Sequence, residues 1–157
     1  MFLRSFCATL LFLGVATAAA AMDARFAGSW RIDSAAPAPW AGPGDIDPKE
    51  AKALVGKTVS FGPKSIAGPQ PIGCKGPHYG VRESDGPDML FEGMLAEPDK
   101  AGKPRNAAAL AREIGMTTPT VATLEVGCTE IAFHAIAPDR LVFALDNQIY
   151  TLKRAGN

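Results

Sequence analysis

The chain has 157 residues, with 16 Lys and Arg, 16 Asp and Glu and two His, so its formal net charge is zero. This balance argues against a nucleic-acid-binding protein, which needs a basic surface to displace counterions from phosphates. With 47% hydrophobic and 20% charged residues, the composition is that of a folded chain and not of a disordered acidic tail. The length fits one domain.

The first 21 residues have the pattern of a secretory signal peptide. Arg4 supplies a positive charge, a short apolar run follows, and an alanine-rich segment ends the pattern at Ala21. The run is shorter than the roughly 20 apolar residues that cross a bilayer. We expect cleavage after Ala20 or Ala21, and a mature domain at 22–157 that is periplasmic or secreted. Residues 4–6 do not form a lipobox before Cys7, so we expect no lipid anchor.

Cleavage would remove Cys7 and leave Cys74 and Cys128 in the mature chain. Two cysteines in an oxidising compartment predict one disulfide bond. The alternative is a catalytic thiol, which would leave the other cysteine idle. We therefore expect Cys74 and Cys128 to be bonded to each other.

Proline and glycine separate short apolar stretches along the mature chain, which favours many short strands over long helices. In the first strand, Trp30 and Ile32 share one face with Phe26 and Gly28. Near the end, Asp146-Asn147 predicts a two-residue hairpin turn that places Leu141 opposite Leu152 and Phe143 opposite Tyr150. The strands are expected at 26–33, 57–61, 79–83, 89–95, 121–128, 130–136, 140–145 and 148–153, with 79–83 paired to 89–95. A further short strand is conceivable at 65–68.

Two short helices are expected between these strands. The first follows Asp47 as N-cap and Pro48 at the first helical position, and it stops before Gly56. The second spans 107–114, between Asn106 and Gly115. About eight strands with alternating faces predict a mainly-β domain, a single small antiparallel barrel.

Residues near both ends of the mature chain resemble the lipocalin-like (calycin) barrels. Gly28-Ser29-Trp30 matches the Gly-x-Trp of that superfamily's first strand. Arg154 matches the arginine near the last strand that packs over the tryptophan at the closed end of the barrel. The resemblance implies a β-barrel in which Trp30 and Arg154 are structural, and it covers about a dozen residues.

Candidates for chemistry are few. His78 and His134 have no second ligand at metal-binding spacing, so we expect no metal site, and no cofactor motif is present. Glu92, in an apolar stretch, and Asp88 are a conceivable acid–base pair, although Glu92 is expected to face solvent. His134 shares a strand face with Ile136 and is either an ordinary surface or hydrogen-bonded histidine or a side chain that points into the barrel mouth.

Trp40 lies in a proline-rich loop at 35–48, where it either covers the core or contacts a ligand or partner. Together with Tyr79 and His134 it forms our set of candidate binding residues. The leading hypothesis is a non-enzymatic exported protein that holds a small apolar or amphipathic ligand in the mouth of the barrel.

Two other functions stay open at this point. One is a periplasmic protein-binding module, such as an inhibitor of a cell-wall hydrolase or protease, using the loops at 35–48 and 74–78. The other is an enzyme in which His134, Glu92 or Asp146 converge in one cleft.

Overall fold

The computed structural model describes residues 22–42 and 44–156. Within them, nine strands form one antiparallel sheet in the order β4-β3-β2-β1-β9-β8-β7-β6-β5. The strands are β1 (Gly28–Pro37), β2 (Thr58–Phe61), β3 (Ser65–Ala67), β4 (Cys74–Lys75), β5 (Gly80–Asp85), β6 (Thr120–Glu125), β7 (Phe133–Ala137), β8 (Arg140–Leu145) and β9 (Gln148–Arg154). The helices are α1 (Pro48–Leu54), α2 (Ala107–Glu113) and the 3₁₀ helix η1 (Leu90–Gly93). The predicted signal peptide lies outside the described residues.

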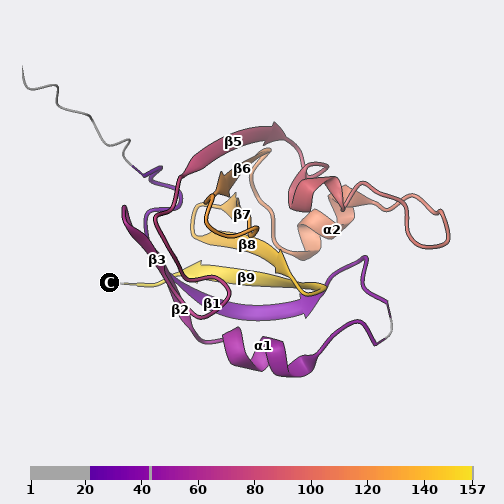
Figure 1. Cartoon of the computed structure of the whole chain (residues 1–157). Helices are drawn as coiled ribbons and strands as arrows, with labels where there is room; N and C mark the ends of the chain where they lie inside the picture. Colours follow the sequence, from indigo (N-terminus) through magenta and orange to yellow (C-terminus); the bar gives the residue numbers. More distant parts are fainter. Residues whose placement is uncertain (1–21, 43, 157) are drawn as a thin grey trace, which may run out of the picture.

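The sheet curls from β1 and β9, at the bottom of the view, round to β5 at the top, with α2 to the right and α1 below (Figure 1). Its inner face holds a cluster of buried side chains, which we call the inner core. Trp30 and Tyr150 are its largest fully buried members. Phe61, Phe133, Phe143 and Tyr150 form a chain of ring contacts with centroids 4.9 to 5.4 Å apart. Dense ring packing of this kind leaves little room for a guest inside the sheet.

A second cluster, the outer core, lies on the other face of the same strands. Val121, Ile136, Val142 and Ile149 point outward from β6 to β9, and side chains of η1 and α2 cover them. The last strands are therefore buried on both faces, which is why much of 131–143 reads as a continuous apolar run. None of the helices in the described residues is long and apolar enough to span a membrane.

The two helices begin and end where the sequence predicts. The side chain of Asp47 accepts a hydrogen bond from the Lys49 N–H at the start of α1, and Gly56 follows the helix at a φ of 85°. Asn106 accepts from the Ala109 N–H at the start of α2, and Gly115 follows it at a φ of 82°. Both glycines have the left-handed backbone that ends many helices.

The predicted closed barrel of about eight strands is wrong. In the part of the chain that the structure describes, the outermost strands β4 and β5 are not paired with each other, so the sheet stays open. β4 has only two residues, and Gly76-Pro77 follows, where proline has no N–H to donate to a ladder. The gap is crossed by the Cys74–Cys128 disulfide and by the Tyr79 hydroxyl, which donates to the Gly62 carbonyl at 2.8 Å.

The predicted strand at 89–95 and its pairing with 79–83 are also wrong. β5 pairs with β6, with Val81 opposite Leu124, and the 89–95 segment forms η1. Phe91 and Glu92 have φ values of 52° and 58°, and Gly93 has 87°, so the chain turns sharply. This turn buries the adjacent Leu90 and Phe91 together in the outer core, which a strand of alternating faces does not do.

Candidate functional site

Trp30 and Arg154 form the contact that the lipocalin-like resemblance implies. The Arg154 guanidinium carbon lies 4.2 Å from the centroid of the buried Trp30 ring. The same guanidinium donates hydrogen bonds to the carbonyls of Ala27 at 2.7 Å and Arg25 at 3.0 Å. Trp30 in turn donates its indole N–H to the Phe26 carbonyl. Both residues therefore hold the segment before β1 against β9, which is a structural role.

Cys74 and Cys128 are bonded to each other, as predicted. The disulfide joins the edge strand β4 to the turn after β6, which is the strand next to the opposite edge strand β5. Tyr79 lies beside this junction, partly buried against the inner core, and burial raises the pKa of its hydroxyl. Because that hydroxyl donates to the Gly62 carbonyl, the structure gives Tyr79 a bridging role between two parts of the sheet.

His134 does not face the inside of the sheet. It points from β7 into the outer core and is 1% exposed. Its Nδ1 is 2.9 Å from the Thr123 hydroxyl, and its Nε2 accepts the Phe91 N–H at 3.3 Å. Burial, with a smaller contribution from the charge of Arg82, lowers its pKa to about 4. The ring is thus neutral at pH 7, with both nitrogens hydrogen-bonded, and it anchors η1.

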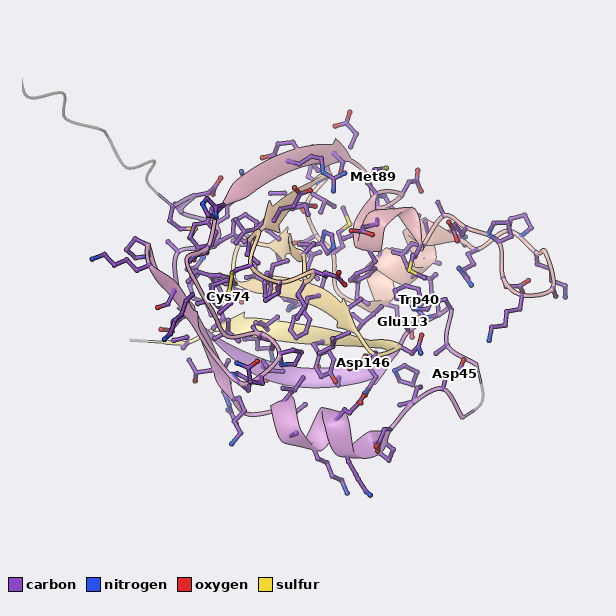
Figure 2. All side chains as sticks on the ribbon, in the orientation of Figure 1. Trp40, Asp45, Cys74, Met89, Glu113 and Asp146 are labelled. Atoms are coloured by element: carbon purple, nitrogen blue, oxygen red, sulfur yellow. A yellow bond between two sulfur atoms is a disulfide. The ribbon has the colours of Figure 1, made fainter. Side chains whose placement is uncertain are left out.

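Trp40 covers the outer core instead of standing free. Its ring lies 5.6 Å from that of Phe91, and it packs against the outer core while remaining partly exposed. Trp40 lies on the α2 side of the molecule, and Cys74 lies on the opposite side (Figure 2). The loops at 35–48 and 74–78 therefore do not form one continuous surface around these two residues.

The residues considered for catalysis are not brought together into one cleft. Glu92 and His134 line one cavity beside η1, whereas Asp146 is in the turn between β8 and β9, where its charge acts on Tyr150. Asp88 and Glu92 are both exposed. Among residues 22–42 and 44–156, no group of three or more His, Cys, Asp or Glu side chains is arranged to hold a metal ion.

The feature best suited to binding is a groove outside the sheet, between α2 and the outer face of β1 and β9. We call it the outer groove. Its volume is about 500 Å³, within the range of small-molecule sites. Ala36 and Ile149, which are opposite each other in the β1–β9 register, belong to its floor. The remaining apolar lining is Pro37, Pro39, Leu95, Leu110 and Ile114.

A β-bulge in β1 creates part of this groove. The β1–β9 register shifts between Ile32 and Ser34, so Asp33 is an extra residue in the strand. Ser34 and Ala36 then lie opposite Thr151 and Ile149 on the outer face. A bulge re-aims the side chains that follow it, and here it gives both Asp33 and Ser34 to the lining.

Four charged side chains line the outer groove: Asp33, Glu113, Arg140 and Lys153. Lys153 and Asp33 form an ion pair with 2.9 Å between nitrogen and oxygen. The half-buried Arg140 donates one hydrogen bond at 3.2 Å to the Gly115 carbonyl, just past the end of α2. Among the residues that the structure describes, neither Arg140 nor Glu113 forms an ion pair.

Local sequence patterns do not reveal the outer groove. Pro37 and Pro39 favour a loop at 35–48, whereas β1 continues through a bulge to Pro37. The position of α2 against the outer face of β1 and β9 is a long-range contact that no local pattern predicts. The one available signal was the pair of apolar residues Leu110 and Ile114, four positions apart on the predicted helix.

Comparisons of the chain with protein-family models, with curated proteins and with solved structures each gave no match. None of these comparisons tests the resemblance to lipocalin-like barrels, which stays a prediction.

Proposed function

We propose that this chain is an exported, non-enzymatic binding protein that holds a small amphipathic ligand in the outer groove. The observation that carries the proposal is the groove itself: an apolar floor and wall with four charged side chains among the lining residues. Concave apolar sites with a few convergent polar groups are the usual form of small-molecule sites. Most of the lining belongs to β1, β8, β9 and α2, and Pro39, Leu95 and Ile114 come from the turns that adjoin regular elements.

The site is proposed outside the sheet because the inside is filled. The stack of Phe143 on Tyr150, with centroids 4.9 Å apart, and the neighbouring Phe133 occupy the space where a ligand would lie in an open barrel. Leu54 of α1 also packs into the inner core. Opening a cavity there would cost several kcal/mol in lost packing for each large side chain displaced.

Export is part of the proposal and has two supports. The first is the signal-peptide pattern of 1–21. The second is the Cys74–Cys128 disulfide, because stable disulfides are rare in reducing compartments. Distant relationship to lipocalin-like proteins is likewise proposed, and its support is the stacking of Arg154 over Trp30.

The alternative function is that of a module that binds a periplasmic protein, and a variant of Trp40 tests it. Its support is the partly exposed ring of Trp40. If this alternative holds, Trp40→Ala weakens binding to the partner. The variant also lowers the melting temperature, because the Trp40 ring packs on Phe91, so binding is measured well below that temperature. We rank it second because the two loops on which it depends lie on opposite sides of the molecule at Trp40 and Cys74 (Figure 2).

The outer groove is tested by filling it. Ala36 is exposed on the groove floor, so Ala36→Trp places an indole over Ile149 without entering the core. Ala67 is an exposed alanine on β3, far from the groove lining, and Ala67→Trp is the matched control. Decanol, an uncharged ten-carbon amphiphile, is titrated into each ¹⁵N-labelled protein while amide shifts are followed.

We expect decanol to shift amides of Ala36, Leu110 and Ile149 in the wild type and in Ala67→Trp. In Ala36→Trp the affinity falls at least tenfold, because the indole occupies the space of the alkyl chain. Shifts confined to the inner-core residues, or equal binding by both tryptophan variants, would refute a ligand site in the outer groove.

A further inference from the structure

Three cationic residues lie side by side across the outer face of the sheet. Lys153 of β9 is directly opposite Arg140 of β8 on one side and Arg31 of β1 on the other. Directly opposite residues of antiparallel strands point to the same face, with Cβ atoms about 5 Å apart. We call Arg31, Lys153 and Arg140 the cationic row. Arg140 and Lys153 line the outer groove, whereas Arg31 is not part of the lining and its guanidinium lies beside Gly56.

Repulsion within the cationic row lowers the stability of the sheet unless an anion lies beside it. Like charges directly opposite each other on neighbouring strands destabilise the pairing. Asp33 relieves the row at one position only, through its ion pair with Lys153. Within the described residues no acidic side chain pairs with Arg140, so its charge faces the groove uncompensated by an ion pair.

The Arg140 guanidinium also has N–H groups beyond the one that bonds the Gly115 carbonyl. A guanidinium carries five N–H groups, and the structure assigns one hydrogen bond to this side chain, from NH1 to the Gly115 carbonyl. That bond and the half-buried position hold the guanidinium at the edge of the groove. A planar, held guanidinium is the group that best receives a carboxylate or a similar anion.

The apolar lining begins next to this charge. Ile114 follows α2 directly before Gly115, whose carbonyl receives Arg140, and Leu110 lies one helical turn earlier. Both belong to the groove lining with Ile149. Glu113, the one acidic lining residue outside the Asp33–Lys153 pair, is exposed on α2. The lining carries two positive side chains, Arg140 and Lys153, and two negative ones, Asp33 and Glu113, and Arg31 adds a third positive charge next to Lys153.

We propose that the outer groove selects amphiphiles with a single anionic head group on an aliphatic chain, and that Arg140 is the residue that selects them. This inference rests on the proposed function. The anionic head lies at Arg140 beside Lys153, and the chain runs over Ile149 against Leu110 and Ile114. An anion at this place removes the repulsion within the cationic row, whereas a cation adds to it.

The test compares three ligands with the same ten-carbon chain: decanoate, decanol and decylammonium. Each is titrated into the wild type, Arg140→Gln and Arg140→Lys at low ionic strength, where an exposed charge pair is least screened. Lys75→Gln is the matched control, since Lys75 is an exposed cation on β4, away from the groove lining. Lys153→Gln is a second variant, which keeps the test valid if Arg140→Gln fails to fold.

We expect the wild type and Lys75→Gln to bind decanoate about tenfold more tightly than decanol, and decylammonium more weakly than decanol. Arg140→Gln brings decanoate to the affinity of decanol and leaves decanol unchanged, and Lys153→Gln has the same effect to a smaller degree. Arg140→Lys keeps part of the preference, because it keeps the charge and loses the planar fork.

The two levels of the proposal fail in different ways. Equal binding of decanoate and decanol in the groove, or a decanoate preference that survives Arg140→Gln, overturns the selection of anions and leaves the proposed site standing. Absence of all three ligands from the groove overturns the proposed function itself.

Discussion

His134 shows how one buried side chain can connect two distant segments. It accepts the Phe91 N–H with Nε2 and contacts the Thr123 hydroxyl with Nδ1, so η1 and β6 are both tied to β7. Its ring also lies edge-on to the Phe91 ring, with centroids 5.1 Å apart. A charged imidazolium has no acceptor nitrogen, so protonation would remove the bond to Phe91. The neutral ring is therefore a condition for the packing of η1.

This condition predicts a pH dependence of stability. The unfolded chain protonates His134 near pH 6.5, whereas the folded chain does so only at about pH 4. As the pH falls from 6.5 to 4, the free energy of unfolding therefore falls, by about 3 kcal/mol for this residue. Urea unfolding at a series of pH values will show a smaller decrease for His134→Gln, whose amide oxygen can still accept from Phe91.

His78→Gln is the control for that measurement, because His78 is exposed at the surface. It should follow the wild-type profile throughout. If His134→Gln and the wild type lose stability in parallel between pH 6.5 and 4, the assigned role of His134 is incorrect.

At the scale of elements, Arg154 fastens the segment before β1 to the end of β9. Its guanidinium bonds the Ala27 and Arg25 carbonyls while stacking on Trp30. Phe26, which lies within this segment, is fully buried in the inner core. The segment before β1 is not part of the sheet, so strand pairing does not hold it. The contact of Arg154 holds it in place over the inner core.

We expect Arg154→Gln to lower the free energy of unfolding by about 2 kcal/mol, the size of a charged hydrogen bond with a cation–π contact. Arg154→Lys should lose about half as much, because the ammonium keeps the charge over Trp30 and loses the fork. Urea unfolding followed by tryptophan fluorescence measures both, with Lys75→Gln as the surface control. Equal stability of Arg154→Gln and the control would contradict this role.

Local signals in the sequence were sufficient for most elements. The β8–β9 hairpin has the predicted register, with Leu141 opposite Leu152 and Phe143 opposite Tyr150. Asp146 and Asn147 have φ values of 48° and 61°, as a tight hairpin turn requires. In these elements the turn chemistry and the apolar pattern agree, and both act over a few residues.

The elements that failed prediction depend on distant partners. The 89–95 segment contains a strand-like apolar run, but its conformation is set by His134 and by the outer core. In β1, no residue type in 33–37 predicts the bulge at Asp33 or the continuation of the strand to Pro37. The outer groove combines these two features with the position of α2, so it could not be derived from local patterns.

For the molecule as a whole, the prediction of a closed barrel failed although the faces of its strands were assigned well. Trp30 and Ile32 share one face, as predicted, and both are buried in the inner core. Closure, however, requires the first and last strands of the sheet to pair, and that depends on strand tilt and register summed over the whole sheet. The alternation of apolar and polar residues along one strand does not determine the tilt and register of the whole sheet.

The Cys74–Cys128 disulfide takes the place of that missing strand pairing. Its cysteines are 54 positions apart, so in the chain-entropy account the bond stabilises the fold by about 4 kcal/mol. We expect the double variant Cys74→Ser/Cys128→Ser to lose about this much in urea unfolding, and the reduced wild type to match it. A loss below 1 kcal/mol in both would show that the open edge is held by other contacts.

The same bond has a topological consequence. It makes 74–128 a closed covalent ring, and the exposed segment 96–104, which projects from the molecule near α2, belongs to that ring (Figure 1). Projecting loops are where proteases cut first. A single cut there opens the ring without releasing either piece, so β1 to β5 and β6 to β9 stay joined. A chain cut in this exposed segment therefore remains one molecule.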